Sequence, residues 1–164
     1  TDFFFFFCAG NINTQPPLGA MWKADGLFTA IQFGWTSNQL VMRFDPDEAS
    51  TTRQGLDVDI RLQAPQCTFR LTFALASPGP EAFLLSRQTQ ADAWQEIGSY
   101  RSIKTHTILE LAVPWKELCL EQGNTIQMSI IVREHGLEVA RYPGHHPAVL
   151  TVPGPEFEAE LWRV

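Results

Sequence analysis

The chain has 164 residues, of which 45% are hydrophobic and 12% aromatic, enough to bury one good core but hardly two. Its 12 Lys and Arg residues against 18 Asp and Glu give a formal charge of −6, opposite in sign to proteins that read a phosphate backbone. We therefore predict one folded domain over residues 1–164 with no nucleic-acid partner. Because the chain begins at Thr1, we expect a processed product or a fragment of a larger protein.

The first predicted element is the apolar strand Phe3–Cys8. It is far too short to cross a bilayer, and it lacks the basic leader and cleavage site of a signal peptide. A long loop is predicted next, over Gly10–Gly19, which contains Pro16 and Pro17. These features predict no membrane partner.

Alternation of apolar and polar residues dominates the rest of the chain. In Leu56–Gln63, four apolar side chains alternate with four polar ones, so a strand here turns one face to a core and the other to water. Strands with one wet face are typical of antiparallel sheets. The segments with strand patterns are, in order, Leu27–Trp35, Leu40–Asp45, Leu56–Gln63, Thr68–Leu75, Glu81–Gln88, Ala93–Gly98, Thr107–Val113, Asn124–Arg133, Glu138–Tyr142, Ala148–Val152 and Phe157–Trp162.

Turn-forming residues separate these segments at intervals of about 8–12 residues, which is typical of a two-sheet β-sandwich. Only Pro114–Leu120 has a helical pattern, since proline can open a first turn and the apolar residues after it recur at three- and four-residue spacing. We predict an all-β fold: a two-sheet antiparallel sandwich with one short helix.

The three cysteines are widely spaced and odd in number, which predicts neither a disulfide framework nor a zinc knuckle. Cys8 and Cys119 have apolar neighbours and are expected to act as small hydrophobic residues. A reducing compartment, and so a cytoplasmic location, fits this usage best.

Catalytic patterns are weak. Glycoside cleavage needs two carboxylates facing each other across a bond. Asp57 with Asp59, and Glu158 with Glu160, each share a strand face, but they alternate with core residues and are expected to point to solvent. The sequence also has no nucleophile elbow and no glycine-rich phosphate loop. We predict that the chain alone is not an enzyme.

Cofactor patterns are equally sparse. Asp45, Asp47 and Glu48 could offer oxygens to calcium, although Asp-Pro-Asp is also an ordinary turn sequence. The adjacent His145 and His146 would face opposite ways on a strand. Met42 and Met128 could be haem ligands, but they are expected to face inward as packing residues. We predict no resident cofactor and keep calcium as the alternative.

Aromatic residues are the remaining resource for binding. A sugar ring stacks on an exposed aromatic side chain and needs polar partners for its hydroxyl groups. Trp22, Trp94 and Tyr142 lie near loop signals with polar neighbours, among them Arg141, and are the candidate ligand-binding residues. Trp35 and Trp115 are in phase with core residues, and a structural role stays open for Trp22 and Trp94 as well.

Three stretches resemble parts of known β-sandwich families. Gly19–Leu27, followed by the strand to Trp35 and by Leu40–Asp45, resembles the start of the C-terminal β-sandwich of glycoside hydrolase family 57 amylases and glucanotransferases. Leu109–Leu118 resembles the strand, Val-Pro, aromatic and short-helix element of DOMON-like and family 9 carbohydrate-binding sandwiches. Phe157–Trp162 is similar to the last strand of such a domain. The chain departs from the family pattern at Trp22, where members often carry histidine.

The resemblance covers about residue 19 to 164 and implies a DOMON-like, galactose-binding-like or jelly-roll-like sandwich. It also implies a non-catalytic accessory domain of an amylolytic enzyme, whose partners would be an α-glucan or oligosaccharide and the catalytic domain of the parent chain or another subunit. Two alternatives stay open. The chain could be a structural domain that packs on a neighbouring domain or subunit, or a free-standing lectin-like sandwich.

Overall fold

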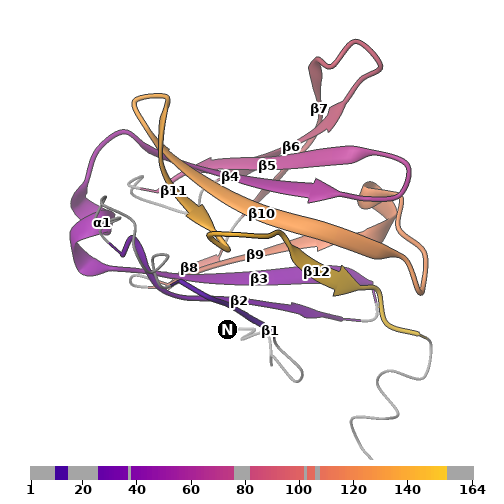
Figure 1. Cartoon of the computed structure of the whole chain (residues 1–164), viewed down its shortest axis with the longest axis horizontal. Coiled ribbons are helices and arrows are strands. Elements are labelled where there is room, and N and C mark those ends of the chain that lie inside the picture. Colours follow the sequence, from indigo (N-terminus) through magenta and orange to yellow (C-terminus); the bar gives the residue numbers. More distant parts are fainter. Residues whose placement is uncertain are drawn as a thin grey trace, which may run out of the picture.

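A computed structural model describes residues 10–14, 26–36, 38–75, 82–101, 103–105 and 108–154. Within them the chain forms two antiparallel β-sheets stacked face to face, with short helical turns at the ends (Figure 1). The predicted all-β, two-sheet sandwich is confirmed. The predicted strands Phe3–Cys8 and Phe157–Trp162 lie outside the described residues.

One sheet has five strands in the order β1-β2-β3-β9-β8. Its strands are β1 (Gly10–Ile12), β2 (Phe28–Trp35), β3 (Gln39–Pro46), β8 (Ile103–Thr105) and β9 (Ile108–Pro114). The pairing of β3 with β9 joins strands that are far apart in the sequence, with Met42 opposite Leu111. Strand β1 corrects the first three residues of the predicted loop Gly10–Gly19, because they pair with Ile31–Phe33 of β2, whereas residues 15–19 lie outside the described residues. The short strand β8 was not predicted.

The other sheet has seven strands, six of them in the order β11-β10-β4-β5-β6-β7. The seventh, β12, pairs with β10 along the same edge as β11: β11 covers Ile130–Glu134 and β12 covers Thr125–Met128. The strands are β4 (Leu56–Gln63), β5 (Thr68–Ala74), β6 (Ala82–Gln88), β7 (Trp94–Arg101), β10 (Thr125–Glu134), β11 (Leu137–Tyr142) and β12 (Ala148–Thr151).

The core lies between the two sheets and follows the predicted alternation. Met42 of β3 and Met128 of β10 are fully buried, as expected of packing residues. Phe44 and Phe73 meet edge to face across the two layers, at 5.7 Å between ring centroids. Each large apolar side chain removed from water here contributes about 1.5–3 kcal/mol to folding, so the predicted inward faces of β3, β4, β5 and β10 hold the layers together.

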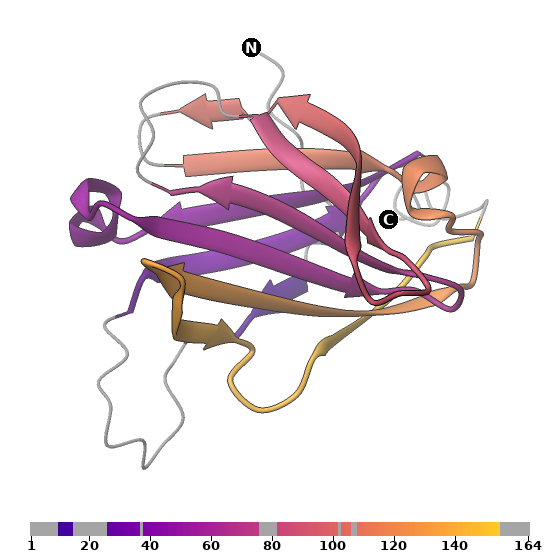
Figure 2. The ribbon, with the colours of Figure 1, turned by 90° about the horizontal axis from the view of Figure 1, so that it is seen from above.

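Two short helical elements lie at opposite ends of the sandwich (Figure 2). The predicted helix after Pro114 is present as the 3₁₀ turn η1 (Trp115–Leu118), and Trp115 packs edge to face on Trp35. The turn ends at Cys119, whose φ of 50° places it in the left-handed region. Cys119 is exposed, so the prediction of an apolar setting for this residue is wrong.

The second helix, α1 (Glu48–Thr52), was not predicted. Its segment Glu-Ala-Ser-Thr-Thr has no apolar repeat, so periodicity could not reveal it. Side-chain hydrogen bonds stabilise the helix instead. The Asp47 carboxylate accepts a hydrogen bond from the Ala49 amide, and the Ser50 hydroxyl donates one to the Leu27 carbonyl. In the part of the chain that the structure describes, no helix is long and apolar enough to cross a membrane.

Candidate functional site

A buried carboxylate lies on the outer face of the seven-stranded sheet, the face turned away from the core. Asp59 of β4 is only 2% exposed. Its Oδ2 accepts a bond of 2.5 Å from Nη1 of Arg133 on β10, and its Oδ1 accepts one of 3.0 Å from the Thr72 hydroxyl on β5. The alternation is as predicted, but the expected exposure of Asp59 is wrong, because long side chains from the two neighbouring strands cover it.

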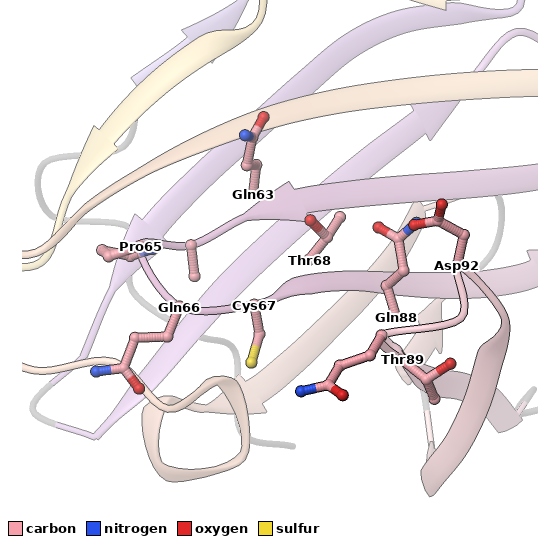
Figure 3. A pocket seen from close by; sticks show the side chains of 10 residues that line it. Gln63, Pro65, Gln66, Cys67, Thr68, Gln88, Thr89 and Asp92 are labelled. Carbon is pink, nitrogen blue, oxygen red and sulfur yellow. The ribbon is translucent and has the colours of Figure 1, made fainter.

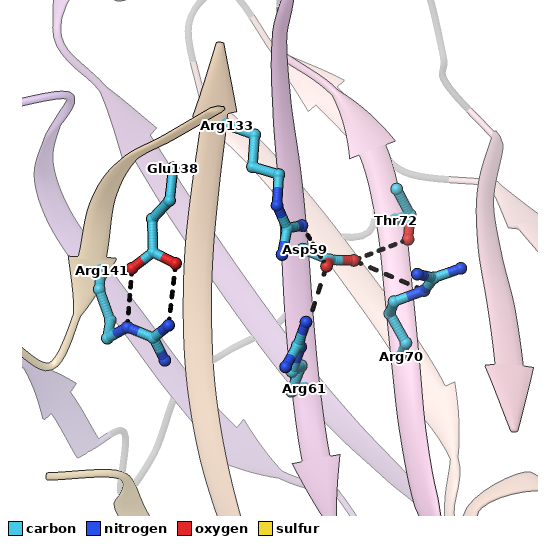
Figure 4. A network of polar contacts seen from close by, with 7 residues as sticks. All are labelled: Asp59, Arg61, Arg70, Thr72, Arg133, Glu138 and Arg141. Carbon is cyan, nitrogen blue, oxygen red and sulfur yellow. Dashed lines mark hydrogen bonds and ion pairs between the residues drawn. The ribbon is translucent and has the colours of Figure 1, made fainter. Parts of the chain in front are cut away.

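Two further arginines approach the same carboxylate without a hydrogen bond to it. Nε of Arg70 lies 3.7 Å from Oδ1 of Asp59, and Nε of Arg61 lies 4.0 Å from Oδ2. Figure 4 shows the arginines reaching Asp59 from three strands, β4, β5 and β10. We call Asp59, Arg61, Arg70 and Arg133 the arginine cluster. It places three cations around one anion, in a chain whose net charge is −6.

The predicted ligand residue Trp94 borders this cluster. Trp94 opens β7 and is half-buried, and the guanidinium carbon of Arg70 lies 4.7 Å from the centre of its ring. This is a cation–π contact, which fixes the ring and the guanidinium group relative to each other. The structure thus joins a predicted aromatic candidate to charged groups that the sequence did not single out.

A polar pocket of about 380 Å³ lies next to Trp94, between the β4–β5 turn and the β6–β7 turn. Gln88, which lines it, is the cross-strand partner of Trp94. The pocket is open to solvent and rich in amide and hydroxyl groups. Its lining residues are Gln63, Ala64, Pro65, Gln66, Cys67, Thr68, Gln88, Thr89, Gln90 and Asp92.

The side chains of this pocket approach it from both faces of the sheet. Gln63, Thr68 and Gln88 extend to one side of the strands, whereas Gln66 and Cys67 extend to the other (Figure 3). The amide of Gln88 donates to the Asp92 carboxylate at 3.1 Å, which orients its oxygen and the second amide hydrogen. The pocket can therefore offer both donors and acceptors to a ligand.

The other predicted ligand residues behave differently. Tyr142 is 4% exposed and packs edge to face on Phe28, so the expectation of an exposed ring is wrong. Burial raises the pKa of its hydroxyl, and the nearby backbone N–H of Leu27 lowers it by a smaller amount, although the two groups do not reach hydrogen-bond geometry. Arg141 is exposed and donates two bonds of 2.9 Å to Glu138. Trp22 lies outside the described residues.

The predicted calcium ligands are not gathered around one point. Asp45 accepts two bonds from Arg43, at 2.8 and 3.0 Å, and Asp47 caps α1. Glu48 is exposed in the first turn of that helix, where a carboxylate suits the helix dipole. No group of three His, Cys, Asp or Glu residues that could hold a metal ion occurs among the described residues. His145 and His146 are exposed in the loop before β12.

A second buried carboxyl lies on the outer face of the five-stranded sheet. Glu110 of β9 is 6% exposed and is the cross-strand partner of Arg43 on β3. Burial raises its pKa, the Arg43 cation lowers it and the Asp45 anion raises it further. Arg43 donates two hydrogen bonds to Asp45, so its cation only partly offsets the effect of burial on the pKa of Glu110.

No protein-family model matches the chain. No curated protein and no solved structure matches it either.

Register is the signal that could have revealed the arginine cluster. The loop Ala64–Cys67 joins β4 to β5 and places Arg61 opposite Arg70, which a hairpin prediction could have anticipated. Arg133 joins them only because β10 pairs with β4, with Ile131 opposite Asp59. The second predicted carboxylate pair, Glu158 and Glu160, lies outside the described residues.

Proposed function

We propose that this chain is a non-catalytic saccharide-binding domain that holds an α-glucan or another oligosaccharide at Trp94 and the neighbouring pocket. The main support for this proposal is a pocket of about 380 Å³ that is lined by amide and hydroxyl side chains and lies beside the half-buried indole of Trp94. Sugars present apolar C–H faces and a rim of hydroxyl groups, which need an aromatic surface and neutral hydrogen-bonding groups, respectively.

The pocket chemistry favours a polar ligand over an apolar one. Glutamine offers two donors and an acceptor at one end, so a few of them can bond the paired hydroxyl groups of a sugar ring. Gln63, Gln66, Gln88 and Gln90 all line the pocket. The open shape suits a chain that continues beyond the bound unit.

We also propose which kind of protein this domain belongs to and where it is located. The resemblance to glycoside hydrolase family 57 sandwiches supports an accessory role beside a catalytic domain of an amylolytic enzyme, with catalysis on that partner and none on this chain. We also retain the predicted cytoplasmic location, which is in keeping with the free thiols of Cys67 and Cys119.

Calorimetric titration of the chain with maltohexaose tests the binding proposal. We expect saturable binding that Trp94→Ala weakens about tenfold or more, since an aromatic contact of this kind contributes about 0.5–1.5 kcal/mol beyond its buried area. Gln88→Ala is expected to weaken binding less. Gln54→Ala is the matched control, because Gln54 is exposed in the turn before β4, at the opposite end of that strand from the pocket. Absence of heat with maltohexaose and with longer glucans would overturn α-glucan binding.

A second candidate function is an interaction domain that packs on a neighbouring domain or subunit. It is favoured by two exposed apolar side chains at separate points along one edge of the seven-stranded sheet, Leu137 on β11 and Val149 on β12, which are 74% and 64% exposed. Sedimentation of the chain tests it. Self-association that Leu137→Ser with Val149→Ser abolishes would support this function, whereas a monodisperse monomer would count against it.

A further inference from the structure

Arg61 and Arg70 form a cross-strand pair of like charge. They are directly opposite each other on β4 and β5, on the same outer face of the sheet (Figure 4). Like charges in this position destabilise a sheet. Asp59 compensates them only at a distance, because Nε of Arg70 and Nε of Arg61 lie 3.7 and 4.0 Å from its oxygens.

The pair also has hydrogen-bonding capacity that the protein does not use. Nε of Arg61 and Nε of Arg70 are both buried and have no hydrogen-bond partner. A buried polar group without its hydrogen bond destabilises the fold, so a ligand that supplies the bond is favoured. Both side chains are nevertheless reachable from solvent, with exposed fractions of 43% and 30%.

Two other arginines of the molecule have a carboxylate at hydrogen-bond distance. Arg43 donates two bonds to Asp45, and Arg53 donates two bonds of 2.6 Å to Glu134. These are the two-pronged pairs that the planar fork of arginine forms with an oxyanion. Arg61 and Arg70 lack such a carboxylate at bonding distance.

We propose that the Arg61–Arg70 pair binds an oxyanion, and that this oxyanion belongs to an acidic saccharide whose ring lies at Trp94. The saccharide part rests on the proposed function, whereas the oxyanion part rests on the pair itself. Arg70 links the two because its guanidinium group contacts the ring of Trp94. A carboxylate, sulfate or phosphate group supplies the same bonding chemistry, so the ligand class is a sugar that carries one of these groups.

The oxyanion site can be tested without any sugar. The Nε–Hε resonances of the arginines are followed by NMR during titration with sodium sulfate, with sodium chloride at matched ionic strength as the reference. We expect saturable shifts at Arg61 and Arg70 and none at Arg43, whose donors are occupied. Shifts that are linear, or equal for sulfate and chloride, would overturn the site.

A matched pair of variants separates this site from general charge effects. Arg61→Gln is expected to abolish the saturable shift at Arg70. Arg87→Gln removes the same charge from the neighbouring strand β6, but Arg87 is opposite Phe69, whose side chain faces the core, and so lies on the other face of the sheet. An equal loss in both variants would overturn the assignment to this pair.

The saccharide part is tested by calorimetry with two ligands of equal length, maltohexaose and hexagalacturonate. We expect the acidic ligand to bind about tenfold more tightly, one charge-assisted contact, and Arg61→Gln to remove this preference. Trp94→Ala should weaken both ligands. Equal affinity, or tighter binding of maltohexaose, overturns the acidic preference and leaves the proposed function standing. A sulfate site without binding of either saccharide overturns the proposed function and supports the oxyanion site alone.

Discussion

Two clusters of charged side chains, one on each outer face of the sandwich, carry opposite charge balances on the same kind of scaffold. On the seven-stranded sheet, three arginines surround Asp59. On the five-stranded sheet, the carboxylates of Asp45 and Glu110 share the single cation of Arg43. In both places the groups come from neighbouring antiparallel strands. The difference indicates that the surplus charge of such a cluster sets the chemistry to expect there: the anion site that we propose at the first cluster, and the raised pKa of Glu110 at the second.

Of the changes that test this difference between the two clusters, replacement of Asp59 is expected to lower the stability of the protein most. Asp59→Asn keeps the shape but removes the buried carboxylate that the three arginines share, and should lower the free energy of unfolding by about 2–3 kcal/mol. Sulfate should restore part of the loss, because it can replace the missing anion between Arg61 and Arg70. Denaturant melts in sulfate and in chloride at equal ionic strength measure this. An identical loss in both salts would contradict the anion-binding character of this face.

The next largest effect is a difference in stability between variants of two arginines of the cluster. Arg133→Gln removes the shortest bond to Asp59 and should cost about 1–2 kcal/mol of unfolding free energy. Arg61→Gln relieves repulsion across the strands and should leave stability within about 0.5 kcal/mol of the wild type, or raise it. Urea unfolding of both variants checks this order. A larger loss for Arg61→Gln would mean that its contact with Asp59 outweighs the repulsion.

The smallest expected effect concerns Glu110 and depends on pH. Burial raises the pKa of this carboxyl above its ordinary value of 4.5, so the folded state favours the protonated form. The resulting stabilisation is complete below the ordinary pKa and is lost as the pH rises through the raised pKa. Glu110→Gln should therefore unfold at a higher temperature than the wild type at neutral pH, and at the same temperature in acid. Thermal melts between about pH 3.5 and pH 7.5 measure the difference. A constant difference across this range would show that Glu110 does not titrate in the fold.

Alternation of side chains predicted the architecture because it is a local property of each strand. It located the inward faces of β3, β4, β5 and β10 and therefore the core between the sheets. It also placed Asp59 on the outer face correctly, but exposure is not local. Whether an outward side chain meets water depends on the length of the side chains beside it, and here Arg133 comes from a strand 74 residues away.

Errors in the candidate site have a similar origin. Tyr142 has polar sequence neighbours, which suggested exposure, yet it is the cross-strand partner of Ile130 and shares its inward face. Asp45 and Asp47 are close in sequence, but one pairs with Arg43 and the other caps a helix. Trp94 could be identified because it lies near a turn and has polar sequence neighbours. The pocket beside it could not be predicted, because it forms between two hairpin turns whose relative position the sequence does not give.

The division of the β10 edge between two partners limits how this protein can assemble. A long strand with one free side is a template on which another chain can add its own strand, the first step of aggregation. Here β11 occupies one half of that side and β12 the other, and these strands have only six and four residues. Each new edge is too short to guide a long intermolecular ladder. The sandwich can therefore keep apolar side chains such as Leu137 and Val149 at this border without inviting sheet-to-sheet polymerisation along β10.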